Sequence, residues 1–295
     1  MSLLSAATTE RASLLHIDPA RFRERFARQP FVVRHRLSDH PLFGLPRLIE
    51  LARALPEDRV EYNAGDVPVS LDPSRTPRTG LSIDETIRRI QECRSWMVFK
   101  NVERDSEYRA LLDACLDQIR EHSESMPGMG QREGFIFVSS PDSVTPYHMD
   151  PEHNFLLQIR GRKQVSLFDG DDRALLSERE LEKFYARGHR NLTFDDANQD
   201  KAQVFELTPG DGLYFPVTWP HWVKNGPHVS VSFSITFRTV WSDRREILYH
   251  VDERLGRLGI RLSPVGRSEL ADGVKYHAFR TLASARRLLG GRPVA

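Results

Sequence analysis

The sequence contains few of the features that mark disulfide-rich, redox or membrane proteins. It has only two cysteines in 295 residues, Cys93 and Cys115, and no Cys-x-x-Cys pair. This excludes a disulfide framework and a cysteine-based zinc or redox motif, and it fits a reducing compartment. No uninterrupted apolar run approaches the roughly 18 residues that a membrane-spanning helix needs.

A dominant charge of one sign is also missing. Lysine and arginine total 42 against 41 acidic residues, and no basic run stands out. We therefore expect neither nucleic acid nor membrane as a partner. The first residues lack the basic and apolar regions of a signal peptide, so a cytoplasmic protein is expected. Proline and glycine, 18 of each, are near average usage, which argues against wholesale disorder.

The N-terminal part of the chain mixes helical and strand patterns. Leu45, Leu48, Leu51 and Leu55 recur at helical spacing. The expected helices cover residues 45–55, 83–93 and 105–121, and the expected strands cover 31–35 and 96–100. Residues 1–19 and 64–82 are expected to be loosely ordered or loop.

From residue 134 the apolar period changes to two. Strands are expected over 134–139, 154–160, 163–168, 203–207, 213–216, 219–223 and 229–238, with one helix over 178–187 and two more over 243–258 and 274–289. Gly161-Arg162 predicts a tight hairpin between two of these strands. Many short strands joined by turns indicate an antiparallel sandwich or jelly roll with flanking helices. We expect an N-terminal α/β elaboration (1–125), a β core (126–240) and a C-terminal helical appendage (241–295).

One stretch of the β region has the pattern of a metal site. His148 and Asp150 are two residues apart, so on a strand their side chains share a face. Two histidines and one carboxylate on one face suit a mononuclear Fe(II) site with open positions. His221, in a proline-rich loop after a Pro-Gly-Asp turn, is the best third ligand. A lone His-x-Asp is more often a surface pair, and His153 is a rival ligand.

Two basic residues lie on different faces of the predicted strands. Lys163 shares a strand face with Val165 and Leu167, which favours a buried lysine over a solvent-exposed one. Arg238 lies on the polar face of the last strand. The serines on that strand, including Ser232, form either a solvated outer face or a small polar wall around a ligand.

The combined motif set resembles a known family. It comprises Thr145-Pro-x-His-x-Asp, Asn154-Phe, Gln158-Ile-x-Gly-x-Lys163, Pro-Gly-Asp and Pro-x-x-Trp-Pro-His221. Together these are similar to the cupin-like branch of the JmjC oxygenases and, without a gap from Thr145 to Lys163, to the asparaginyl hydroxylase of the hypoxia response. The resemblance covers about residues 130–240. It implies a double-stranded β-helix, a jelly roll, that binds Fe(II) and uses 2-oxoglutarate and O2.

Carried over residue by residue, the resemblance implies site roles. The metal ligands would be His148, Asp150 and His221, with no other catalytic side chain. The 2-oxoglutarate pocket would contain Thr145, Lys163, Asn154, Phe137 and Ser232, with Arg238 as the competing anchor. Ser232 and Met149 depart from the asparaginyl hydroxylase, which has asparagine and tyrosine at these positions.

The family's reaction would make the protein a hydroxylase that releases succinate and CO2. The substrate would be a protein or peptide side chain, an amino acid or a natural-product intermediate. Residues 1–120 and 169–202 would shape its entry.

Two other functions stay open: a metal-binding cupin that acts as an isomerase or as a dioxygenase without 2-oxoglutarate, with Glu152 or His153 as an added ligand, and a non-catalytic binding module. The last two helices, with Ile247, Val251, Leu255 and Leu258 on one face, could form a homodimer.

Overall fold

Two antiparallel sheets form the body of the protein. The computed structural model describes residues 13–72, 77, 79–122, 128–186 and 188–288. In spatial order the larger sheet contains β1 (Leu15–His16), β2 (Phe31–His35), β10 (Asp211–Phe215), β7 (His153–Arg160), β12 (Ser230–Arg238), β5 (Gly130–Ser139), β4 (Ser95–Lys100) and β3 (Val60–Ala64). The smaller sheet contains β6 (Val144–His148), β11 (His221–Asn225), β8 (Lys163–Leu167) and β9 (Gln203–Leu207). The predicted jelly roll with flanking helices is confirmed.

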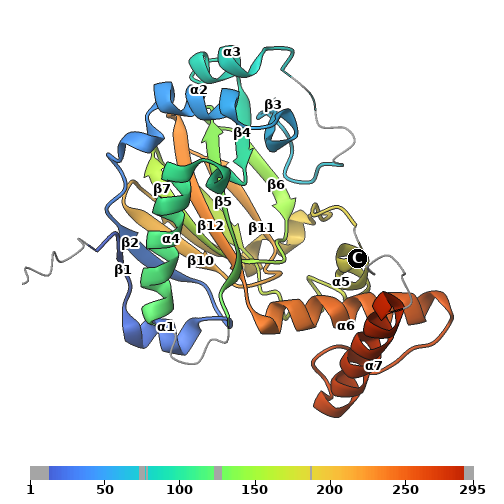
Figure 1. Cartoon of the computed structure of the whole chain (residues 1–295). Helices are drawn as coiled ribbons and strands as arrows, with labels where there is room; N and C mark the ends of the chain where they lie inside the picture. The colour runs from blue at the N-terminus through green and yellow to red at the C-terminus, as the bar shows by residue number, and fades with distance from the viewer. Residues whose placement is uncertain (1–12, 73–76, 78, 123–127, 187, 289–295) are drawn as a thin grey trace, which may run out of the picture.

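Helices cover the outside of the larger sheet and extend the chain at its C-terminus. They are α1 (Pro19–Arg25), α2 (Leu45–Ala54), α3 (Ile83–Arg88), α4 (Ser106–Glu121), α5 (Glu178–Tyr185), α6 (Val240–Arg257) and α7 (Glu269–Leu288). Figure 1 shows α4 lying across the larger sheet, and α6 and α7 forming a hairpin that projects from the barrel. No helix of the described residues is long and apolar enough to cross a bilayer.

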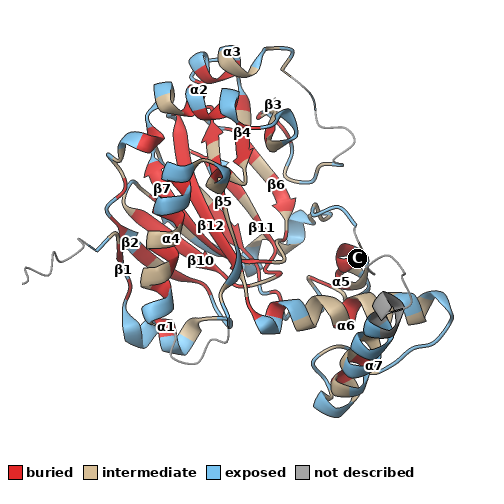
Figure 2. Cartoon of the chain, viewed as in Figure 1, coloured by how far each residue is buried: buried red, intermediate tan, exposed pale blue. Residues whose placement is uncertain are grey.

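Strand β12 shows how the barrel separates an apolar outer layer from a polar interior. Its apolar face, with Phe233 and Phe237, belongs to the same core cluster as residues of α2 and α4. Its serine face is also buried: Ser232 is 0% exposed and Ser234 is 2% exposed. The central strands are accordingly red in Figure 2. The solvated alternative for the serine face is wrong, because this face lies inside the barrel.

The predicted hairpin at Gly161-Arg162 is wrong in its pairing. β7 pairs with β10 and β12, whereas β8 pairs with β11 and β9. The turn therefore carries the chain from one sheet to the other, as a jelly roll requires. Gly161 has a positive φ of 74°, and a Cβ there would lie 2.5 Å from the carbonyl oxygen of Val229. Only glycine fits this crossing, which delivers Lys163 to the space between the sheets.

Several element boundaries in the N-terminal part differ from expectation. β1, α1 and β3 were not predicted, and the first 12 residues lie outside the described residues. α3 begins after Ser82, as expected, but it ends at Arg88 and not at residue 93. The chain turns there, buries Ile90 in the core and enters β4 through Arg94 at a positive φ of 48°. Tertiary contacts therefore override the helical pattern of residues 89–93.

The C-terminal hairpin has its own polar interior. Lys275 is 4% exposed and lies 2.9 Å from Asp252 and 3.2 Å from Asp272. The hairpin also carries exposed apolar side chains, among them Leu258, which is 75% exposed. A homodimer through these helices stays a prediction, as do the boundaries at residues 125 and 240.

Candidate metal centre

Three sequence-predicted ligands converge at one end of the barrel. His148 ends β6, Asp150 follows it by two residues, and His221 begins β11. The pairing of β6 with β11 places His221 directly opposite His148. Asp150 lies beyond the end of the strand, and its backbone carbonyl accepts a hydrogen bond from the N–H of Thr218 at 2.8 Å. The convergence thus comes from strand pairing and one loop contact, and not from a shared strand face.

The ligand atoms are close enough for one ion to bridge them. The Oδ2 atom of Asp150 lies 4.0 Å from Nε2 of His148 and 3.8 Å from Nε2 of His221. One potential ligand atom from each residue lies within 4.8 Å of the others. Metal–nitrogen and metal–oxygen distances near 2.1 Å allow one ion to reach atoms up to about 4.2 Å apart. The donor set of two imidazoles and one carboxylate fits Fe(II) with open positions.

Backbone carbonyls orient both imidazole rings toward the candidate metal position. Nδ1 of His148 lies 2.7 Å from the carbonyl oxygen of Pro146, and Nδ1 of His221 lies 3.0 Å from that of Trp219. A carbonyl can only accept, so each Nδ1 carries the proton and each Nε2 keeps a free lone pair. Burial lowers the pKa of His221 to about 3. Its ring is therefore neutral, as a metal ligand must be.

A loop arginine holds the carboxylate ligand, and no sequence pattern had indicated this residue. Arg190 donates to Oδ1 of Asp150 at 2.6 Å, which leaves Oδ2 facing the two histidines. Burial opposes ionisation of Asp150, but the guanidinium group of Arg190 beside it holds the pKa of that carboxyl below its ordinary value. Arg190 also lies 3.6 Å from Glu152. Its side chain lies 40 residues from Asp150, in a loop without periodic pattern.

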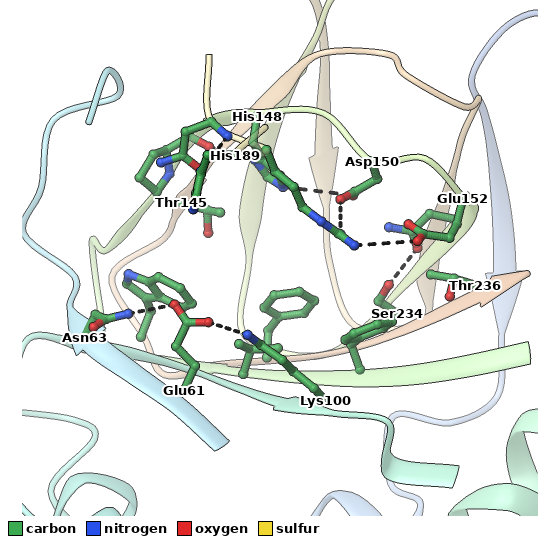
Figure 3. A pocket seen from close by; sticks show the side chains of 18 of the residues that line it. Glu61, Asn63, Lys100, Thr145, His148, Asp150, Glu152, His189, Ser234 and Thr236 are labelled. Atoms are coloured by element: carbon green, nitrogen blue, oxygen red, sulfur yellow. Dashed lines mark hydrogen bonds and ion pairs between the residues drawn. The ribbon is translucent and has the colours of Figure 1, made fainter. Parts of the chain in front are cut away.

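A cavity of about 700 Å³ extends from the candidate metal position (Figure 3). Its lining includes Phe137, Thr145 and Asn154, all expected in the co-substrate pocket. Asn154 accepts a hydrogen bond from Ser234 at 2.8 Å, and Ser234 and Thr236 complete the small polar wall from β12. Ser232 is not among the lining residues and donates to Gln158 at 2.6 Å.

Lys163 is buried between the two sheets and is not among the residues that line the cavity. The register of the smaller sheet aligns Thr145, Val223 and Val165, and Lys163 is two residues from Val165 on the same face. Lys163 is 5% exposed, and burial lowers the pKa of its ammonium group to about 7. Its ammonium group makes no hydrogen bond or ion pair with the described residues. A buried ammonium group without a partner is costly, which suits a site completed by an anionic ligand.

Arg238 is occupied elsewhere. It forms ion pairs with Asp243 at 2.8 Å and with Glu246, both in the first turns of α6. It is not among the residues that line the cavity. His153 also faces away: its Nδ1 lies 2.8 Å from the hydroxyl of Tyr214, on the outer side of the sheet. Both competing residues of the sequence analysis therefore have structural roles.

The outer wall of the cavity comes from the N-terminal strands and from the loop before β9. Lys100 of β4 donates to Glu61 of β3 at 2.6 Å, and Asn63 donates to the same carboxylate at 3.0 Å. Trp96 also lines this wall, and its indole N–H is buried without a hydrogen-bond acceptor among the described residues. Leu71 and residues 188–191 lie opposite. Parts of both regions expected to shape substrate entry, 1–120 and 169–202, thus line the cavity.

Comparison with known proteins agrees with this architecture. The model of the cupin-like domain matches residues 26–243. JmjC domain-containing protein D of Dictyostelium discoideum is 36% identical over 108 residues, which cover 32% of this chain and 22% of that protein. tRNA wybutosine-synthesizing protein 5 of Mus musculus is 27% identical over 156 residues, or 50% of this chain and 44% of that protein. These matches span less than half the length of either relative.

Solved structures share the fold over most of the chain. The crystal structure of Escherichia coli ycfD has a TM-score of 0.53 at 17% sequence identity, with 91% of this chain and 68% of that chain covered. A second structure of the same protein, described as a ribosomal oxygenase in complex with cobalt and 2-oxoglutarate, has a TM-score of 0.50. The family model covers residues 26–243, a range that contains all three candidate ligands and every strand of both sheets except β1. The chain therefore belongs to the cupin-like domain family of the JmjC type.

Proposed function

We propose that the protein is an Fe(II)- and 2-oxoglutarate-dependent oxygenase. It hydroxylates a C–H bond of a protein or peptide side chain, or of a small molecule, and releases succinate and CO2. The observation that carries this proposal is the two-histidine, one-carboxylate cluster, whose His148 and Asp150 line a cavity inside the barrel. A buried lysine without a partner among the described residues, Lys163, lies between the same two sheets. The cobalt and 2-oxoglutarate complex of the structurally similar ribosomal oxygenase supports the choice of metal and co-substrate.

The residues of the site would have three roles: metal binding, co-substrate binding and positioning. His148, Asp150 and His221 would hold Fe(II), which supplies oxidative chemistry with O2 and 2-oxoglutarate when bound. Lys163 and Thr145 would hold the distal carboxylate of 2-oxoglutarate through a charged donor and a hydroxyl. Arg190 fixes the carboxylate of Asp150, and the wall of Phe137, Asn154 and Ser234 limits the space around the co-substrate.

The outer cavity would receive the substrate. It offers a charged pair, Glu61 and Lys100, together with the unused indole N–H of Trp96. These groups suit a substrate that presents hydrogen-bond acceptors next to the C–H bond to be oxidised. An enclosed polar wall orients such a substrate and excludes water from the reacting position.

The test is the anaerobic visible spectrum of the purified protein with Fe(II), before and after 2-oxoglutarate is added. A charge-transfer band that needs both components and vanishes in His148→Ala is the expected result. His228→Ala, which removes an exposed histidine outside the cavity, is the matched control. Bound iron without such a band would refute the use of 2-oxoglutarate and favour a metal-binding cupin of another activity. Failure to bind iron would leave another metal or a non-catalytic module.

A further inference from the structure

A second cavity, of about 760 Å³, lies on the other side of the strand that follows Asp150. It is bounded by α1 and the residues after it, by the C-terminal end of α4, by the start of β7 and by the start of α6. Side chains of β7 alternate between the two cavities: Asn154 lines the first, and His153 lines the second. The second cavity therefore has no lining residue in common with the candidate metal centre.

The second cavity is strongly cationic. Arg23, Arg28 and Arg245 line it, against one acidic residue, Glu121. None of the three guanidinium groups forms an ion pair with a carboxylate of the described residues, although 14 other arginine and lysine side chains of those residues do so, Arg34 and Arg47 among them. The guanidinium group of Arg245 lies over the ring of Tyr249, 5.8 Å from its centroid, whereas Arg23 and Arg28 have no ion-pair partner among the described residues. Two such guanidinium groups at one hollow suit a multivalent anion, because each can donate two parallel hydrogen bonds to phosphate oxygens.

Aromatic rings share the lining with these arginines. Phe22 and Phe26 stack on each other with centroids 4.7 Å apart, and both line the cavity. Trp241 lines it as well and is 64% exposed, which is unusual for a tryptophan. An exposed indole beside arginines can stack on a flat ring and gives up little solvent-exposed polar surface in doing so.

The floor of the cavity is ordered by a chain of hydrogen bonds. The N–H of Ala27 donates to the hydroxyl of Tyr214 at 3.0 Å, and that hydroxyl lies 2.8 Å from Nδ1 of His153. The N-terminus of α6, with Thr239 and Ser242 at the cavity, adds the positive end of an 18-residue helix. The floor is thus preorganised and favours negative charge.

From these features we propose that the second cavity binds a small ligand in which a sugar joins a phosphate group to a planar aromatic base, as in a nucleoside monophosphate. Arg23, Arg28 and the start of α6 contact the phosphate, and Trp241 stacks on the base. This site is independent of the proposed oxygenase activity. A ligand there would also contact His153 and Val217, which belong to the two segments that carry Asp150 and His221.

Isothermal titration calorimetry of the full chain with AMP, and separately with inorganic phosphate, tests this proposal. AMP is expected to bind saturably and at least about tenfold more tightly than phosphate, because stacking adds to the ionic contacts. The double variant Arg23→Ala/Arg28→Ala should weaken AMP binding at least about tenfold, since it removes two charged donors. Both side chains are exposed, so the fold should be retained.

Matched controls separate a built site from general charge. The double variant Arg21→Ala/Arg36→Ala removes the same charge at two exposed arginines that do not line the cavity, and it should bind AMP unchanged. Trp241→Ala should reduce the affinity for AMP to that for inorganic phosphate. An equal loss in both double variants, equal affinities for AMP and phosphate in the unaltered chain, or no saturable AMP binding at millimolar concentration would overturn the proposal.

Discussion

Two buried lysines in different regions of the molecule differ in whether they have ion-pair partners, and this difference separates a structural role from a ligand-binding role. Lys275, in the C-terminal hairpin, is 4% exposed and lies between Asp252 and Asp272. Lys163, between the two sheets of the barrel, is 5% exposed and has no partner among the described residues. The hairpin supplies the counter-charges of Lys275 from its own sequence, whereas the described residues of the barrel provide no counter-charge for Lys163. A protein keeps such an unpaired group when a ligand completes it.

The largest expected effect is on the stability of the hairpin. Lys275→Met should lower the free energy of unfolding by about 3–5 kcal/mol, because it leaves the buried Asp272 and the partly buried Asp252 without a cation. Lys163→Met, the matched substitution, should leave stability unchanged or raise it, because it removes an unpaired buried charge. Chemical denaturation of both variants measures the difference. Equal destabilisation by both substitutions would show that Lys163 has a structural partner after all.

The second comparison is the affinity for the co-substrate. Lys163→Met should weaken 2-oxoglutarate binding to the Fe(II) protein by about 1.5–3 kcal/mol, or roughly 10- to 150-fold, since it removes a charged hydrogen bond. Lys275→Met should leave this affinity unchanged wherever the variant is folded. Anaerobic calorimetry gives both dissociation constants, and an unaltered constant for Lys163→Met would remove this residue from the co-substrate site.

Substitution of Arg190 tests the metal centre without altering any of the three candidate metal ligands. Arg190→Ala should weaken Fe(II) affinity by about 10- to 100-fold, because the carboxylate of Asp150 loses the donor that orients it. The exposed Arg162, which does not line the cavity, gives a control variant, Arg162→Ala, of the same charge change. Iron affinity in a competition assay with a chelator decides the point. Equal affinities in the two variants would contradict this role.

The pH dependence follows from the lowered pKa of Lys163, which burial brings to about 7. Below pH 7 the free protein already carries the ammonium ion that the co-substrate carboxylate needs. Above pH 7 binding must first add a proton, so the affinity should fall by up to about tenfold per pH unit. Calorimetry between pH 6 and pH 8.5 measures this slope, with Lys163→Met expected to show none. A flat profile in the unaltered protein would contradict the role of the lysine.

The smallest expected effect concerns Arg238, the competing anchor. Its ion pairs with Asp243 and Glu246 at the start of α6 leave it outside the cavity. Arg238→Ala should therefore change the affinity for 2-oxoglutarate less than about twofold, and its main cost should be a modest loss of stability. A loss comparable to that of Lys163→Met would make Arg238 an anchor too.

Local patterns predicted much of this fold. The alternation along residues 229–238, the capping serine before α3 and the helical face of α4 each depend on neighbours within a few residues, and the structure confirms them. The prediction of a hairpin at Gly161-Arg162 was wrong, because a tight turn has the same sequence pattern whether it joins two paired strands or connects one sheet to the other. β3 was missed because its five residues lack a clear alternation.

Local motifs predicted the residue types of the candidate site: two histidines, an aspartate and a lysine. Motif spacing suffices for His148 and Asp150, which are two residues apart, whereas His221 was assigned from its own proline-rich motif and from the family resemblance. Only the folded chain shows that Arg190 holds Asp150, that Arg238 faces α6, and that a second, cationic cavity lies behind β7. Arg238 meets carboxylates five and eight residues ahead, but across a junction between a strand and a helix. The other contacts join residues tens of positions apart, where no local periodicity records which side chains will meet.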